Sequence, residues 1–246
     1  MREILADLVA EQQALDQLLQ RAPERDWKRK VPGGKWTVQD TISHLAWSEG
    51  YAKSALDGDA ASLKAVSPSA TVDDINEVGV REGRGRRPQE IIEWWRHNRA
   101  AVVEALSHRR PADRIPWFVS DMSARTFATS RLMETWAHGL DVHAALEREV
   151  VDTIRIRHVA WLGWATLPYA FAAASEDYPA PIRLELVGPA YSSWVFGPPD
   201  TEQVIKGSAG EWCRLAVGRM SARSIGNLTA IGDTAEKALR LARAFP

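Results

Sequence analysis

The sequence of 246 residues has a single cysteine, Cys213. One thiol forms neither an internal disulfide nor a metal site of several thiolates, so a disulfide-stapled secreted domain is excluded and a reducing cytoplasm is the expected location. No histidine lies near Cys213 in the sequence. We therefore predict that Cys213 is a small buried residue and not a nucleophile.

An excess of charge of one sign is also missing, since 31 Lys and Arg face 32 Asp and Glu. No positive field is available to hold a polyanion, so nucleic acid is not expected as a partner. Long hydrophobic runs are missing as well. The most apolar stretch, residues 160–174, is shorter than the roughly 20 residues that a membrane span needs and contains Gly163, Thr166 and Pro168. We therefore expect a buried, kinked helix and no membrane partner. Residues 2–20 carry recurring charges and are predicted to form a helix, not a signal peptide.

What the sequence has is the ordinary mixture of a globular protein, with 45% hydrophobic and 26% charged residues. Its length favours two domains. Apolar residues recur at three- and four-residue intervals in four stretches, which predict long helices. Thr37 and Asp40 form a capping-box-like start for the second of them. The four stretches are residues 2–20, 37–53, 88–108 and about 123–146.

These four patterns predict a four-helix bundle over residues 1–150, whose facing side chains can hold a metal or a ligand. The intervening residues 57–88 are expected to form a loop with a short helix, and their arginines 81, 84, 86 and 87 a solvated cluster, with anion capture or partner docking as alternatives.

The second half changes in character. Residues 154–174 still follow a helical pattern, whereas residues 182–187 alternate between apolar and charged side chains, which is typical of a half-buried strand. Two more short strands are expected at 194–197 and 203–206. Ser208 is predicted to cap a helix over 209–217, and Thr234 a final helix that ends near residue 244. The fold class is therefore α+β, with a small α+β domain over residues 151–246 after the bundle.

The fourth helical pattern carries an unusual polar stripe. Glu134 and His138 lie four residues apart, so their side chains are neighbours on one helix face and can share a divalent ion. Arg131 and Asp141 lie on nearly the same face and are expected to surround that site. His143 points away from this face and is excluded as a ligand.

A third ligand is expected from His44, which lies in mid-helix among apolar residues. Two imidazoles and one carboxylate leave coordination positions open, as in catalytic metal sites, and zinc is the first choice, although nickel, iron and manganese accept the same ligands. The alternative is structural: a Glu-x3-His pair often only stabilises a helix, and a single buried His is often a hydrogen-bonded core residue.

Two motifs resemble a known family. Trp-Thr-Val-Gln-Asp at 36–40, leading to His44-Leu45-Ala46, and Arg-Leu-Met-Glu-Thr-Trp-Ala-His at 131–138 resemble the DinB-like four-helix metalloproteins, and in particular the mycothiol-dependent maleylpyruvate isomerase group. The likeness extends to the second half, where residues 204–212 and 218–219 are similar to that group's small α+β domain, which resembles sterol carrier protein.

The resemblance implies a zinc ion held by His44, Glu134 and His138, and an active site completed by an arginine of the second domain, Arg219, or alternatively Arg223. It also implies mycothiol as a thiol cosubstrate and a small electrophile as substrate. A bound cation turns a coordinated thiol into a thiolate at neutral pH, which gives isomerisation or S-transfer.

Two other functions stay open at this point. A metal-activated water would make the protein a hydrolase, with Asp141 or a nearby carboxylate as base. A non-catalytic metal-binding or small-ligand-binding protein is the other alternative.

Overall fold

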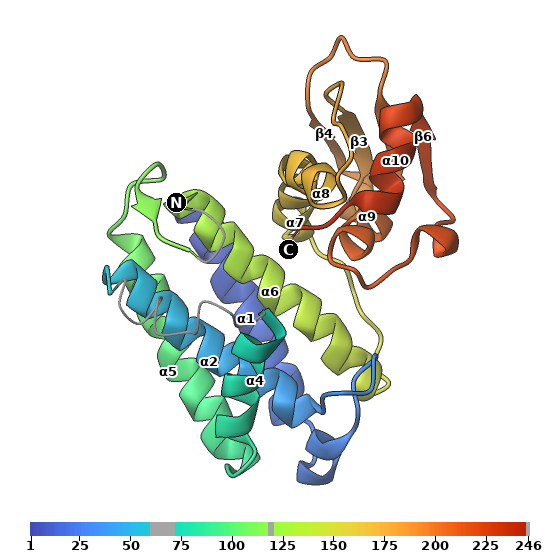
Figure 1. The fold of residues 1–246 in the computed structure, drawn as a ribbon. Helices are drawn as coiled ribbons and strands as arrows, with labels where there is room; N and C mark the ends of the chain where they lie inside the picture. The colour runs from blue at the N-terminus through green and yellow to red at the C-terminus, as the bar shows by residue number, and fades with distance from the viewer. Residues whose placement is uncertain (60–71, 118–120, 245–246) are drawn as a thin grey trace. The chain divides into compact units, whose positions relative to one another are not determined.

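The computed structural model describes residues 1–59, 72–117 and 121–244. The chain divides into two compact units, Met1–Val150 and Val151–Pro246. The first unit is helical apart from one short strand pair, and the second combines helices with a four-stranded sheet (Figure 1). The predicted α+β class, with a helical unit followed by an α+β unit, is thereby confirmed.

Four long helices form most of the first unit, at the positions that the apolar periodicity predicts. Helix α2 packs against α5 and α6, and α1 packs against α6 and α5 (Figure 1). The capping box is present: the Thr37 side chain accepts a hydrogen bond from the Asp40 amide, and the Asp40 carboxylate accepts one from the Thr37 amide. The helices are α1 (Arg2–Gln20), α2 (Val38–Leu56), α5 (Pro88–Ser107) and α6 (Ala124–Ala145).

The shorter elements of this unit are η1 (Glu24–Lys28), α4 (Val72–Gly83) and the antiparallel strands β1 (Arg114–Ile115) and β2 (Met122–Ser123). Helix α4 supplies the helix expected within 57–88, while residues 60–71 lie outside the described part. It approaches α2 closely because Gly79 faces Trp47 and Gly83 faces Ser43, where a Cβ atom would overlap the α2 side chain.

The predicted basic cluster lies at the end of α4 and the start of α5. Arg84 contacts Asp40 at 3.3 Å and Glu77 at 3.1 Å. Arg86 pairs with its neighbour Glu82 at 2.7 Å, and Arg87 pairs with Glu90 at 2.9 Å. Because three of the four arginines pair with nearby carboxylates, local ion pairing explains the cluster without an anionic ligand.

In the second unit the apolar stretch forms two helices, α7 (Ile156–Ala165) and α8 (Leu167–Ala173), which meet at Thr166. This break agrees with the expected kink. The sheet has the order β4-β3-β5-β6, in which β3 and β5 are parallel and the other neighbours antiparallel. Its strands are β3 (Arg183–Val187), β4 (Ser193–Phe196), β5 (Val204–Ser208) and β6 (Leu228–Ile231). The other elements are η2 (Pro189–Tyr191), α9 (Ala209–Ala216), η3 (Ala222–Ser224) and α10 (Asp233–Leu241).

Two details of this unit differ from the prediction. Strand β6 was not expected. The predicted cap of the last helix is also wrong, because the N-cap of α10 is Gly232 and no side chain of that residue or of Thr234 caps the helix. Instead, the Gln203 side-chain oxygen accepts hydrogen bonds from the amides of Thr234 and Ala235, at 2.9 and 3.2 Å. Ser208 does cap α9 as predicted.

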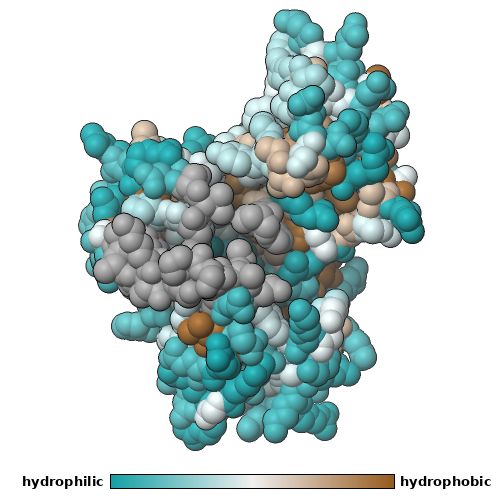
Figure 2. All heavy atoms as spheres, viewed as in Figure 1, coloured by the Kyte–Doolittle hydropathy of each residue, from teal (hydrophilic) through white to brown (hydrophobic). Residues whose placement is uncertain are grey.

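The visible surface is mostly hydrophilic (Figure 2). Among the described residues, no helix is both long and apolar enough to cross a membrane.

Candidate metal centre

His44 of α2 and the pair Glu134 and His138 of α6 meet inside the helical unit. Nε2 of His44 and Nε2 of His138 each lie 3.5 Å from the same oxygen, Oε2 of Glu134. One possible ligand atom from each residue lies within 4.8 Å of the other two. The two imidazole rings meet edge to face, with their centroids 4.8 Å apart. The structure thus brings the three predicted ligands together.

The donor set fits a divalent cation such as zinc. Zinc binds imidazole nitrogen and carboxylate oxygen at about 2.0–2.2 Å, so in a tetrahedral site the ligand atoms are roughly 3.3–3.5 Å apart. The two nitrogen–oxygen distances of 3.5 Å agree with that spacing. Three protein ligands leave one position for a further molecule, which is the arrangement of catalytic zinc sites.

Burial and neighbouring charges favour the metal-binding protonation state of two of the three groups, His44 and Glu134. Burial lowers the pKa of His44, against the opposing effect of Glu134, which favours a neutral imidazole. Burial alone would raise the pKa of Glu134, but hydrogen bonds from His138 and His44 and the charge of Arg131 hold it well below its ordinary value. Metal ligands of these types bind as neutral imidazole and carboxylate, so both groups are prepared for a cation.

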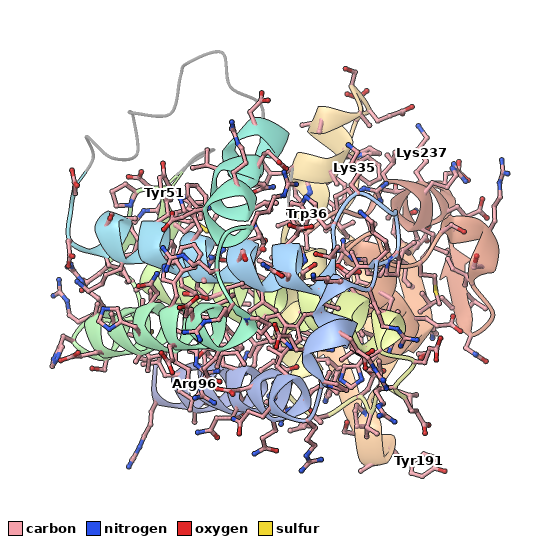
Figure 3. The ribbon with its side chains drawn as sticks, turned by 90° about the horizontal axis from the view of Figure 1, so that it is seen from below. Lys35, Trp36, Tyr51, Arg96, Tyr191 and Lys237 are labelled. Atoms are coloured by element: carbon pink, nitrogen blue, oxygen red, sulfur yellow. The ribbon has the colours of Figure 1, made fainter. Side chains whose placement is uncertain are left out.

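The surroundings orient the second imidazole. Oδ2 of Asp141 lies 3.3 Å from Nδ1 of His138, the ring nitrogen opposite to the one that faces Glu134. A carboxylate on this side of a metal-bound imidazole can fix the orientation of the ring. Burial lowers the pKa of His138, but Asp141 and Glu134 outweigh burial and raise it. The centre of the Trp36 ring lies 5.1 Å from that of the His44 ring and 6.0 Å from that of the His138 ring. Trp36, labelled in Figure 3, lies two residues before the start of α2.

Arg131 lies one turn before Glu134 in α6 and is not one of the three candidate ligands. Its Nη1 donates a 2.7 Å hydrogen bond to the Ser48 hydroxyl, and its guanidinium carbon lies 5.1 Å from the centre of the Trp117 ring. Arg131 therefore acts on the cluster through its charge. His143 is not part of the cluster, as expected.

Sequence reasoning missed Glu49, a residue of α2 that is 0% exposed. Neither of its carboxylate oxygens has a hydrogen-bond partner among the described residues. Burial, reinforced by the charge of Glu134 and opposed by that of Arg131, raises its pKa to about 7. A signal was present, because Glu49 continues the helical spacing of the buried residues Ile42 and Leu45.

Arg219 and Arg223 belong to the second unit, and their role at the cluster stays a prediction. Arg219 Nη1 donates a hydrogen bond of 3.0 Å to the Val217 carbonyl. Cys213 is buried as predicted, and its thiol donates to the Ile156 carbonyl at 3.4 Å. Burial raises the pKa of this thiol well above its ordinary value, which keeps it unreactive.

The fold and the cluster together define a class: an α+β protein whose helical unit carries one glutamate and two histidines able to hold a metal. The chain belongs to the mycothiol maleylpyruvate isomerase N-terminal domain family, whose model matches residues 8–143. The resemblance seen in the two motifs is thereby confirmed.

Relatives extend the likeness over both units. An uncharacterized protein of Mycobacterium tuberculosis, present in strains CDC 1551 and H37Rv, is 36% identical over 98% of this chain and 94% of its own length. The fold is similar to the crystal structure of the mycothiol-dependent maleylpyruvate isomerase, with a TM-score of 0.62 at 18% identity, covering 93% of this chain and 92% of that one. A histidine-to-alanine mutant of that enzyme gives a TM-score of 0.61 at 17% identity, with the same coverage.

Proposed function

We propose that this protein is a mycothiol-dependent isomerase or S-transferase in which His44, Glu134 and His138 hold a divalent cation, zinc in the first place. The observation that carries the proposal is the convergence of two imidazole nitrogens on one carboxylate oxygen, each at 3.5 Å, inside a domain of this family. The proposed partners are a low-molecular-weight thiol, mycothiol, and a small electrophile. The proposed location is a reducing cytoplasm, where such a thiol persists.

When bound, the cation would lower the pKa of a thiol in the open position, so that a thiolate is available at neutral pH. A thiolate that adds to an activated alkene leaves a single bond that can rotate, and loss of the same thiol then yields the isomer. Attack on another electrophile gives S-transfer. The protein's own thiol is not needed, which agrees with the burial of Cys213.

The side chains around the ligands have definite tasks in this proposal. Asp141 orients His138 through Nδ1, and the charge of Arg131 helps to keep Glu134 ionised. Because Asp141 lies against His138, it is not positioned as the free base that a hydrolase would require. Arg219 is proposed to complete the active site from the second unit.

The test is a titration of mycothiol into the cobalt-substituted protein, followed in the near ultraviolet for a sulfur-to-cobalt charge-transfer band. We expect a saturable band that is lost in Glu134→Ala and in His138→Ala. His143→Ala is the matched control, because it removes a histidine from the same helix outside the cluster, and it should keep the band. Bound cobalt without a band in the wild type would overturn thiol activation and favour a binding role.

The same variants test the activity. Full mycothiol-dependent turnover of an electrophile in both Glu134→Ala and His138→Ala would also contradict the proposal.

A further inference from the structure

The turn of α2 that follows the candidate ligand His44 carries a second acidic group, the buried Glu49, whose pKa responds to the charge of the candidate ligand Glu134. His44 of α2 faces Glu134 of α6. One turn further along α2, Ser48 contacts Arg131, which lies one turn earlier in α6 than Glu134. The two helices therefore run in opposite directions here, and successive turns form successive layers. Glu49 belongs to the layer of Ser48 and Arg131.

Glu49 is in an unusual state for a structural residue. It is 0% exposed, and both carboxylate oxygens have no hydrogen-bond partner among the described residues. A buried carboxylate without such partners carries a large desolvation cost, so a group kept for stability alone is normally paired. An unpaired, buried, titratable group beside a candidate metal centre is typical of a functional residue.

The neighbouring charges do not lock Glu49 in one protonation state. The charged groups that act on it are Arg131 and Glu134 from α6 and Arg99 from α5. Arg99 is already engaged with α1, where it donates to the Gln12 carbonyl at 2.7 Å and to the Asp16 carboxylate. Arg131 donates one hydrogen bond, to Ser48, and its Nε has no hydrogen-bond partner among the described residues.

The proposed reaction creates a charge problem that Glu49 is placed to solve. A thiol enters as a neutral molecule and must lose a proton to act as a thiolate. A divalent cation carries two positive charges, and Arg131 adds one; Glu134, Asp141 and an ionised Glu49 supply three negative charges that balance them. If the thiol proton left for the solvent, the thiolate would give this group a net negative charge, which is costly where water is largely excluded. If a nearby buried carboxylate takes the proton, the total charge of the site does not change.

Resting on the proposed function, we propose that Glu49 is the charge-compensating proton acceptor of the centre, which takes up one proton when a thiol enters as thiolate. One S–H bond breaks, one O–H bond forms on the Glu49 carboxylate, and the sulfur keeps the electron pair, so no oxidant or reductant is involved. Loss of the thiol reverses the transfer.

In the metal-free chain the pKa of Glu49 is about 7, mainly because the group is buried. A nearby divalent cation would favour its ionised form, and an added thiolate its protonated form. A group that titrates near neutral pH changes its protonation in response to one added charge nearby, whereas an ordinary carboxylate or a permanently neutral acid does not.

The experiment counts protons. Mycothiol is titrated calorimetrically into the full-length zinc-loaded protein at pH 7.5, in two buffers of different ionisation enthalpy, which gives the protons released per thiol bound. A thiol with an ordinary pKa of about 8.5 gives up about one proton when it binds as thiolate, and a hydroxide displaced from the zinc takes up part of that proton. The deciding quantity is therefore the difference between variants. We expect the wild type to release clearly fewer protons per thiol bound than Glu49→Gln, and Glu49→Asp, which keeps a carboxylate, to resemble the wild type.

The cobalt charge-transfer band, measured in parallel, separates the two proposals. A band together with equal proton release from the wild type and Glu49→Gln would overturn the role of Glu49 and leave thiol activation standing. No band in the wild type would overturn thiol activation itself. If Glu49→Gln does not fold, Glu49→Met takes its place, and equal proton release from that variant and the wild type would overturn the role of Glu49.

Discussion

Ionisation of the unpaired carboxylate of Glu49 should lower the free energy of unfolding as the pH rises from 4.5 to 8. The substitution Glu49→Gln should remove this contribution. Glutamine has nearly the shape of a protonated glutamate and does not ionise. We therefore expect the variant and the wild type to differ little near pH 4.5, and the variant to be clearly more stable above pH 7.

The magnitude follows from the shift in pKa. Glu49 titrates at about 7 in the folded chain instead of the ordinary 4.5, mainly because it is buried. An acid whose pKa is higher in the folded state binds its proton more tightly there, so folding loses stability as the pH rises from 4.5 through 7. At about 1.4 kcal/mol per pKa unit, the difference in free energy of unfolding reaches about 3 kcal/mol above pH 7.

The assay is urea unfolding of the chelator-treated proteins at several pH values from 4.5 to 8, followed by circular dichroism of the helices. The quantity of interest is the stability of the variant minus that of the wild type at each pH, because other titrating groups contribute equally to both. Glu104→Gln, an exposed substitution on α5, is the matched control and should show no gap at any pH.

A gap of constant size across the pH range would refute the reasoning, because it would mean that the substitution acts through packing and not through ionisation. A wild type more stable than the variant at pH 8 would show that Glu49 has a partner that stabilises its charged form.

Other consequences of the structure can be measured as directly. Asp141→Asn should lower metal affinity about 10- to 100-fold in a chelator competition, because it loosens the orientation of His138; unchanged affinity would remove Asp141 from the site. Asp16→Asn should lower the free energy of unfolding by about 3 kcal/mol in urea titrations, since this buried carboxylate pairs with two arginines of α5, one of them labelled in Figure 3. A loss below 1 kcal/mol would show that the pairs are dispensable. Gly83→Ala should lower the free energy of unfolding by about 1–3 kcal/mol, because the added Cβ overlaps a serine side chain of α2. Gly85→Ala is the control, because a Cβ there meets nothing within 4 Å, and the two variants are compared by thermal melting. Equal melting temperatures of the two variants would contradict this packing.

The part of the molecule that the sequence predicts well is governed by local rules. The long helices follow from apolar periodicity, and the start of α2 from the capping box of Thr37 and Asp40. The placement of Glu134 beside His138 needed only the geometry of one helix. His44 could be added because a histidine in the middle of an apolar helical run has to face the interior.

What the sequence did not predict depends on contacts between distant segments. Glu49 continues the spacing of an apolar helix face, but a search for apolar residues leaves out a charged one. Its burial follows from the packing of the assembled helices. Strand β6 is four residues long with one buried side chain, so its pattern is too short to recognise without its partner β5. The start of α10 depends on Gln203, 31 residues before Thr234, and not on a local cap.

The division of the candidate ligands between two helices also makes the stability of the folded protein depend on the metal. Two of them share α6 and stay near one another in any helical segment, but His44 joins them only when α2 is packed in place. An ion bound by all three would link two helices whose ligands are about 90 residues apart in the sequence. Because it binds only the folded chain with all three ligands, it would stabilise the folded state by mass action. The melting temperature should then rise with the free zinc concentration, and the amount of intact protein in a cell would follow the supply of the metal.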